Sequence, residues 1–150
     1  YGYIEEALIH AKKAYNYWIE SEPTVSAYIA SMYANMGRLY ADLNATDMAK
    51  SYLEKSADVS LELEGKDGLG YAIKLANLAN FYNEQEQYEA ALEYGLKAIK
   101  IFEKSNSDEN IENLATTYRN TGKTYNDLKE YSKSETAYKK AIGYHTFLSY

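Results

Sequence analysis

The sequence LANLANFYNEQEQYEAALEYGLKAIKIFEK, residues 75–104, predicts two amphipathic helices joined by a short polar turn. In the first helix, apolar residues recur three and four positions apart and so share one face: Leu75, Leu78, Ala79 and Tyr82. Residues 83–87 are all polar. The second helix has the same kind of face, formed by Ala91, Tyr94, Leu96, Ala98, Ile99 and Phe102. One such hairpin cannot bury both of its helices, so we expect it to pack on similar hairpins of the same chain.

The chain repeats this hairpin at a regular interval. A small residue followed three positions later by tyrosine occurs at offsets of 42 and 43 residues, as Gly37 with Tyr40, Ala79 with Tyr82, and Gly122 with Tyr125. The second helices keep the register in two sets, which are Ala49, Ala91 and Ser134, and Ser56, Ala98 and Ala141. Ala7 and Ala14 extend it toward the N-terminus. Self-similarity at this period predicts an all-α, antiparallel helix-hairpin solenoid.

The pattern predicts helices over residues 4–20, 25–43, 46–64, 69–84, 88–105, 110–128 and 131–148. We expect a single domain over residues 1–150, with a half repeat at 1–24 and full repeats at about 25–67, 68–108 and 109–150. Because the helical pattern runs to both ends of the sequence, we expect the chain to be a fragment of a longer protein.

Composition excludes several classes of function. The absence of cysteine excludes disulfides, thiolate metal sites and a cysteine nucleophile, but it does not choose a compartment. The net charge of −6 argues against nucleic-acid binding, and no apolar run is long enough to span a membrane. His10 and His145, the only histidines, lie near opposite ends of the sequence and predict neither a metal site nor histidine-based catalysis. No cofactor motif is present.

The repeat resembles the tetratricopeptide repeat, whose signature combines a bulky residue, a Gly or Ala, and a tyrosine on the first helix with alanines on the second. The residues that carry the resemblance are Tyr33, Leu75 and Tyr118, then Met36 and Leu78, then Gly37, Ala79 and Gly122, then Tyr40, Tyr82 and Tyr125. Thr121, Ser134 and Gly95 depart from the signature, and its final proline is absent. The longer period looks like the extended-helix variety of kinesin light chains and Rap-type peptide receptors. The resemblance implies a right-handed superhelix that binds protein or peptide segments.

A polar stripe runs along the first helix of each repeat, opposite its apolar face. Asn35, Asn77 and Asn120 share one register on it, followed by Arg38, Asn80 and Lys123. In this family the first helices line the concave groove, so the resemblance implies that these side chains face it. A row of amides can pair with the backbone of an extended peptide, and Arg38, Arg119 and Lys123 can receive a carboxylate. The alternative is that the asparagines are ordinary solvated positions.

These observations favour a non-catalytic scaffold that binds a protein or peptide, because no activated nucleophile or general base can be assembled from the sequence. The alternative function is a sensory, regulatory or oligomerisation module of a bacterial signalling protein. Apolar residues of the last helix, among them Tyr138, Ile142, Phe147 and Leu148, predict that further repeats or another subunit cover that end. The last helix is therefore a candidate surface for self-association.

Overall fold

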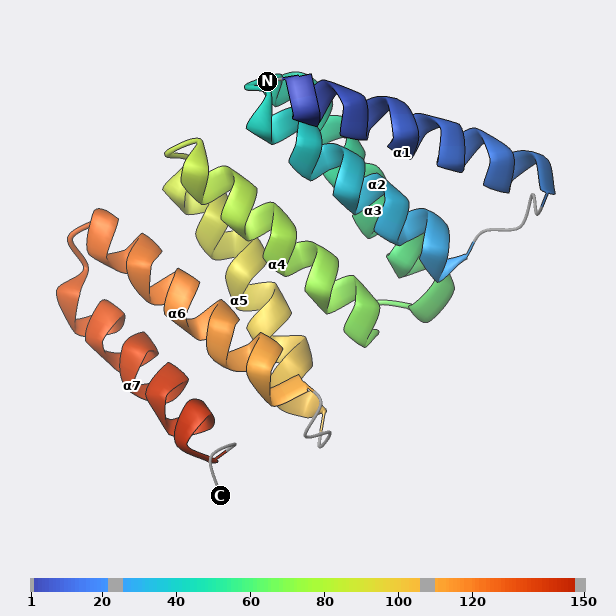
Figure 1. Ribbon diagram of the computed structural model, residues 1–150. Helices are drawn as coiled ribbons and strands as arrows, with labels where there is room; N and C mark the ends of the chain where they lie inside the picture. The colour runs from blue at the N-terminus through green and yellow to red at the C-terminus, as the bar shows by residue number, and fades with distance from the viewer. Residues whose placement is uncertain (1, 22–25, 106–109, 148–150) are drawn as a thin grey trace. The chain divides into compact units, whose positions relative to one another are not determined.

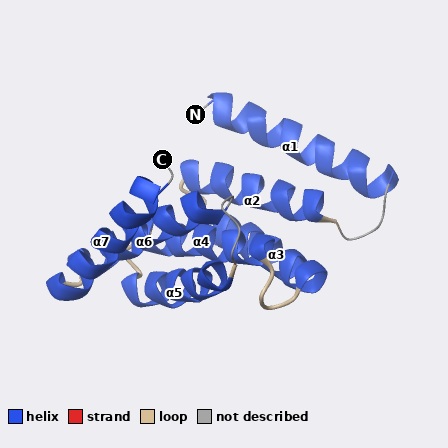
Figure 2. Ribbon diagram, turned by 90° about the horizontal axis from the view of Figure 1, so that it is seen from below, coloured by secondary structure: helices blue, strands red, loops and turns tan. Residues whose placement is uncertain are grey.

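The computed structural model describes residues 2–21, 26–105 and 110–147, and these residues form helices without any strand (Figure 1, Figure 2). The helices are α1 (Gly2–Ser21), α2 (Ala27–Asp42), α3 (Thr46–Glu64), α4 (Leu69–Glu84), α5 (Tyr88–Lys104), α6 (Ile111–Asp127) and α7 (Tyr131–Phe147). The predicted all-α helical-repeat fold is confirmed. Of the predicted helix ends, Val25 and Leu148 lie outside the described residues. At the start of α2, the side chain of Ser26 accepts a hydrogen bond from the backbone N–H of Ile29 and caps the helix.

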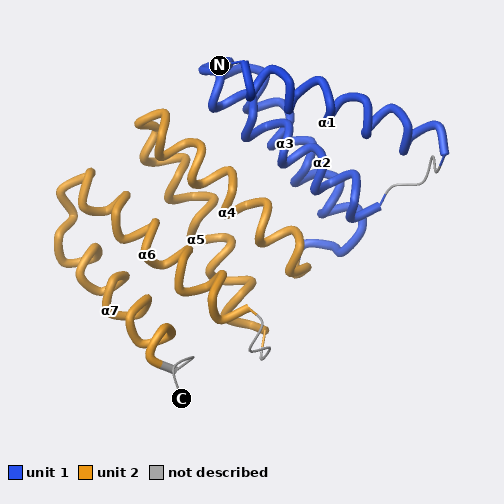
Figure 3. The backbone as a smooth tube through the Cα atoms, in the orientation of Figure 1, with its two compact units in different colours: residues 1–66 blue, residues 67–150 orange. Residues whose placement is uncertain are grey.

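The chain divides into two compact units, residues 1–66 and 67–150 (Figure 3). In the first unit, α2 packs on α3 and also contacts α1. In the second unit, α4 packs on α5 and α6 packs on α7, while α5 and α6 join the two hairpins. The predicted organisation as one domain with a leading half repeat stays a prediction.

Three hairpin turns use the same backbone conformation. Asn44, Glu86 and Lys129 follow α2, α4 and α6 at matching positions and have φ of 58°, 58° and 62°. The next residue after each of them donates its backbone N–H five residues back, to Tyr40, Tyr82 and Tyr125, at 2.9, 2.9 and 2.8 Å. This left-handed C-terminal motif satisfies carbonyl groups that end the helix, and it turns the chain sharply enough for the next helix to fold back.

The two helices of each hairpin touch where a small residue faces a residue of the second helix. Gly37 faces Leu53, and Gly122 faces the ring of Tyr138. In the middle hairpin the glycine lies on the second helix instead, where Gly95 of α5 faces the β carbon of Ala79 of α4. A β carbon added at Gly95 would lie 3.7 Å from that of Ala79, which is an ordinary van der Waals contact.

Burial confirms most of the predicted apolar face of α4 and α5. Leu75, Leu78, Ala79 and Tyr82 are buried, and so are Ala91, Ala98, Ile99 and Phe102. The prediction was wrong for Leu96, which is 44% exposed because it lies at the edge of α5 rather than on the face packed against α4 and α6. Ala7 and Ala14, which continue the repeat register into α1, are exposed. None of the helices in the described ranges is both long and apolar enough to cross a membrane.

Candidate functional site

The seven residues predicted to bind a peptide differ in exposure. Four of them are exposed, namely Asn35 and Arg38 on α2 and Arg119 and Lys123 on α6. Three are half-buried, namely Asn77 and Asn80 on α4 and Asn120 on α6. Asn35 and Arg38 belong to the first compact unit, and the other five belong to the second.

The structure brings Asn80 and Asn120 together. The side-chain NH₂ of Asn120 donates a 2.7 Å hydrogen bond to the side-chain carbonyl oxygen of Asn80. One turn further along, the Thr124 hydroxyl lies 3.2 Å from the side-chain oxygen of Asn83 and 3.0 Å from the backbone oxygen of Asn120, and donates toward both. These contacts join α4 to α6, which lie side by side (Figure 1). The polar stripe therefore contains a hydrogen-bonded cluster of Asn80, Asn83, Asn120 and Thr124, which we call the amide cluster.

Sequence reasoning missed Asn83 and Thr124 as members of this cluster. Asn83 belongs to the polar stretch 83–87 and also to the predicted helix 69–84, and it lies in the last turn of α4. Thr117, Thr121 and Thr124 recur at helical spacing and are all buried, a pattern that marks the side of α6 facing its neighbours. The spacing of these threonines was therefore the feature of the sequence that indicated a contact of Thr124 with a neighbouring helix.

Part of the hydrogen-bonding capacity of the amide cluster is already used. Each asparagine amide offers two donors on nitrogen and two acceptor positions on oxygen. The bond between Asn80 and Asn120 uses one donor and one acceptor position, so both amides retain groups for a further partner. A cavity of about 10 Å³ adjoins the cluster, with Ala79, Asn80 and Asn120 among its lining. That volume is at the lower limit for one water molecule, so it holds no ligand side chain. A peptide would have to bind across the outer edge of the amides.

The cationic residues beside the amide cluster are open to solvent. Lys123 Nζ lies 4.0 Å from the carboxylate of Asp127, one turn away on α6, and its side chain is 62% exposed. An exposed pair of this kind is worth little energy, so Lys123 can exchange Asp127 for a carboxylate of a ligand. Within the described residues, no three His, Asp or Glu side chains gather as a metal site would require.

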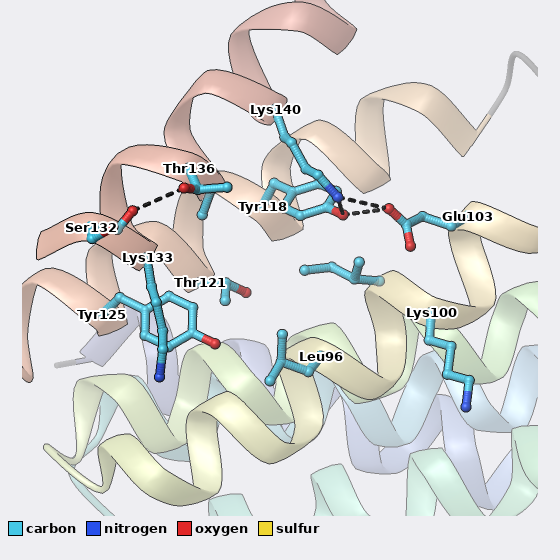
Figure 4. Close-up of a pocket in the computed structure, with 12 residues that line it drawn as sticks. Leu96, Lys100, Glu103, Tyr118, Thr121, Tyr125, Ser132, Lys133, Thr136 and Lys140 are labelled. Atoms are coloured by element: carbon cyan, nitrogen blue, oxygen red, sulfur yellow. Dashed lines mark hydrogen bonds and ion pairs between the residues drawn. The ribbon is translucent and has the colours of Figure 1, made fainter. Parts of the chain in front are cut away.

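A second cavity, of about 400 Å³, lies between α5 and α7 with α6 as its floor (Figure 4). Tyr118, Thr121 and Tyr125 of α6 form the floor, and Leu96 and Ala137 contribute from α5 and α7. We call it the α5–α7 pocket. It was not predicted from the sequence. The signal for it was present, because Ala137 occupies the register that holds Tyr52 and Tyr94 in the other hairpins.

Charged groups form a small network on one side of the α5–α7 pocket. Lys140 Nζ donates a 2.7 Å hydrogen bond to the Tyr118 hydroxyl and lies 3.4 Å from the carboxylate of Glu103, which also accepts from that hydroxyl (Figure 4). Burial raises the pKa of Tyr118, the bond to Glu103 adds to the rise, and Lys140 opposes it. The hydrogen bond with Tyr118 raises the pKa of Lys140 as well. Near neutral pH this side of the pocket therefore carries a neutral phenol and a charged ammonium.

Comparison with protein families decides the assignment of the chain. The family model described as tetratricopeptide repeat matches residues 28–104 and, in a second overlapping match, residues 70–144. The chain belongs to the tetratricopeptide repeat (TPR) family. Its predicted resemblance to that family is thus confirmed. A comparison with curated proteins found no match.

Solved structures share the fold of this TPR chain. BtubC (BKLC) from P. vanneervenii superposes with a TM-score of 0.90 over 99% of the chain at 18% identity. The apo form of RapI superposes with a TM-score of 0.77 over 97% of the chain at 23% sequence identity. A third structure is a putative kinesin light chain from Podosopora anserina with nearly identical TPR-like repeats. It superposes with a TM-score of 0.63 at 11% sequence identity, and the match covers 98% of this chain and 89% of that one. The chain spans 59% of the length of BtubC and 40% of the length of RapI.

Two departures from the TPR signature have structural explanations. Ser134, which replaces an alanine, donates a 2.8 Å hydrogen bond to the backbone oxygen of Gly122 across the third hairpin. Thr121, which replaces a bulky apolar residue, is buried between α6 and α5, with its hydroxyl beside Gly95. A β carbon added at Gly95 would lie 3.0 Å from that hydroxyl oxygen. The threonine thus occupies space that the glycine leaves open.

Proposed function

We propose that this TPR chain is a non-catalytic scaffold that binds an extended peptide segment along the first helices of its repeats. TPR proteins bind protein or peptide partners. The finer assignment is our own, to the amides of Asn77, Asn80 and Asn120 in the second unit and, within the first unit, to that of Asn35. The observation that carries it is the hydrogen bond between Asn80 and Asn120. That bond holds two amides of neighbouring first helices in fixed positions, so a peptide meets groups that are already oriented.

The remaining chemistry of the stripe suits a peptide backbone. Each amide carries a donor and an acceptor side by side, which is the pairing that a peptide unit needs. Arg119 and Lys123 are exposed on α6. They would donate hydrogen bonds to a carboxylate of the peptide, either an acidic side chain or the C-terminus. Arg38 would act in the same way beside Asn35 on α2.

The experiment compares Asn77→Ala and Asn120→Ala with Asn126→Ala, a control that removes an exposed amide from another side of α6. A peptide is first selected by display against the whole chain, and its binding is measured by calorimetry. Each loss of a hydrogen bond at Asn77 or Asn120 should cost about 1 kcal/mol, or roughly a fivefold loss of affinity. The control should bind like the wild type.

Thermal unfolding separates binding from folding. Asn120→Ala should lower the melting temperature, because it also removes the bond to Asn80. Asn77→Ala should leave the melting temperature nearly unchanged and still weaken binding. If both variants bind the peptide as tightly as the wild type while remaining folded, the amides do not hold the ligand.

The second candidate function is a regulatory or oligomerisation module. One observation favours it, because Tyr138 and Ile142 on α7 are 36% and 64% exposed and lie one turn apart. Large apolar residues clustered on an exposed helix face mark interaction surfaces. The two functions are compatible, because the α7 face and the amide cluster lie on different helices.

A further inference from the structure

The first hairpin contains a packed group of three tyrosines and a lysine. The ring of Tyr52 stacks on Tyr40, with 5.3 Å between ring centroids and 9° between planes, and it lies 5.9 Å from Tyr33. The ammonium of Lys55 is 5.2 Å from the centroid of Tyr52 and 5.9 Å from that of Tyr33. Tyr52 is therefore the central ring of the group, in contact with the other three members.

The middle hairpin keeps the stacked pair at the same register. Tyr82 and Tyr94 have centroids 5.4 Å apart and planes 3° apart. Lys97 lies 5.7 Å from the centroid of Tyr94, in the place that Lys55 takes beside Tyr52. The stacked tyrosine pair with its lysine is thus a recurring element of these hairpins.

The third hairpin keeps every member of the group except the central ring. Tyr118, Tyr125 and Lys140 lie 85 positions after Tyr33, Tyr40 and Lys55, but the counterpart of Tyr52 is Ala137. Lys140 remains over the Tyr118 ring, at 4.8 Å from its centroid. The three retained side chains and Ala137 all line the α5–α7 pocket (Figure 4). The pocket is the space that the missing tyrosine would help to fill.

The size and lining of the pocket suit an aromatic group with an acidic neighbour. Its volume of about 400 Å³ falls within the range of roughly 300–1,000 Å³ that is usual for ligand sites. Apolar contact comes from Leu96, Ile99 and Ala137. The charged residues of the lining are three lysines and one glutamate, namely Lys100, Lys133, Lys140 and Glu103. This lining is cationic, although the whole chain has a net charge of −6.

We propose that the α5–α7 pocket receives the aromatic side chain of an acidic peptide segment from a partner protein. The ring stacks on Tyr125 where Tyr52 and Tyr94 stack on their partners in the other hairpins. Carboxylates beside the ring on the peptide pair with Lys133 and Lys140. An aromatic residue with one polar end suits a site that is apolar below and charged at the rim.

Entry of the ring requires only small changes in the pocket. Lys133 lies 5.5 Å from the centroid of Tyr125 and is paired with Glu130, but its side chain is 62% exposed. Moving an exposed lysine away from such a pair costs little. Ala137 is buried on the α7 side of the pocket, and its methyl group takes up little of the space. The site is also separate from the amide cluster, since Tyr118 and Tyr125 lie on the opposite side of α6 from Asn120 and Lys123 at about 100° per residue.

The decisive variant is Ala137→Tyr, which restores the group found in the first hairpin. The probe is a short acetylated and amidated peptide of sequence Gly-Asp-Tyr-Asp-Gly. It is titrated into the whole chain and followed by NMR of the alanine methyl, tyrosine ring and asparagine side-chain amide signals. The wild type should show saturable shifts at Ala137 and Tyr125. Ala137→Tyr should bind at least about tenfold more weakly, with an unchanged or higher melting temperature, because its own ring takes the place of the ligand. Ala137→Leu, with a smaller side chain, is the second variant and should weaken binding if the tyrosine variant fails to fold.

Three further titrations define the occupant. A peptide with leucine in place of tyrosine, and one with asparagine in place of both aspartates, should each bind several-fold more weakly than the probe. Free N-acetyltyrosine should also bind more weakly, because it lacks the flanking acids. The proposal is overturned if Ala137→Tyr and Ala137→Leu bind the probe as well as the wild type, or if the shifts fall on Asn80 and Asn120 instead. Binding of N-acetyltyrosine as tightly as the peptide would show that the pocket takes a small aromatic acid and not a peptide segment.

Discussion

Gly37 in α2 lies directly against Leu53 in α3, so that a β carbon on Gly37 would lie 2.6 Å from Leu53 Cγ and 3.1 Å from its backbone nitrogen. The contact fixes the distance between the two helices of the first hairpin. Glycine is needed here for space and not for an unusual backbone angle, since it lies within a regular helix. The equivalent contact in the third hairpin is looser, because a β carbon added at Gly122 would lie 3.3 Å from ring carbons of Tyr138.

Gly37→Ala should therefore destabilise the chain. Overpacking against a buried leucine and its backbone costs about 1–3 kcal/mol, and the gain of alanine over glycine in helix propensity offsets roughly 1 kcal/mol of it, so we expect a net loss of up to about 2 kcal/mol. The matched control is Gly143→Ala in α7, where nothing lies within 4 Å of the added carbon. It should stabilise the chain by up to about 1 kcal/mol. Urea unfolding followed by circular dichroism measures both. Equal effects of the two substitutions would mean that space at Gly37 does not limit the hairpin.

Glu86→Gly should stabilise the second hairpin turn. Glu86 has φ of 58°, a left-handed conformation that costs an ordinary L-residue roughly 1–2 kcal/mol and costs glycine nothing. The greater freedom of glycine in the unfolded chain offsets part of this gain, so we expect up to about 1 kcal/mol. Asn44→Gly, at the equivalent turn, should change stability less, because asparagine tolerates this conformation. A loss of stability in Glu86→Gly, measured by the same unfolding assay, would contradict this account.

Tyr33 should make folding sensitive to alkaline pH. Burial raises its pKa from 10.0 to about 12, and the 2.7 Å hydrogen bond between the hydroxyls of Tyr33 and Tyr15 adds to the shift. A raised pKa means that the folded state holds the proton more tightly than the unfolded state does. The resulting stabilisation is complete below pH 10 and is lost as the pH rises from about 10 to 12.

Comparison with Tyr33→Phe isolates this effect from the other tyrosines. Free energies of unfolding measured at intervals from pH 8 to pH 12 should fall less steeply in the variant between pH 10 and pH 12. An absorbance titration at 295 nm should likewise lose one late-ionising phenol in the variant. Parallel pH profiles of the two proteins would show that Tyr33 ionises at its ordinary pH.

The exposed face of α7 should mediate self-association. Sedimentation equilibrium of the wild type should show an average mass that rises with concentration. Ile142→Lys should reduce this rise, because it places a charge on a residue that is 64% exposed and apolar. Leu63→Lys, which changes an exposed apolar residue of α3, is the control and should behave like the wild type. A wild-type chain that stays monomeric at every concentration would leave α7 without this role.

The helices, their pairing and the family can all be predicted from the order of the residues. Apolar residues spaced three and four apart identify the buried face of each helix, and the interval of 42 and 43 residues identifies which helices are equivalent. The first helix of each hairpin ends shortly after a tyrosine whose carbonyl group accepts a hydrogen bond from the turn that follows. These residues are Tyr40, Tyr82 and Tyr125. These features are local, so a helical period and a repeat are sufficient to predict them.

Which polar groups meet, and where a pocket remains, is known only from the packed helices. Asn80 and Asn120 are 40 positions apart, and nothing in either helix alone indicates that their amides are hydrogen-bonded. The pocket at Ala137 depends in the same way on the facing residues of α5 and α6. Periodicity gives only the direction in which a side chain leaves its own helix. Its partner is set by how far the neighbouring helix is shifted and tilted, and that depends on the packing of the whole hairpin.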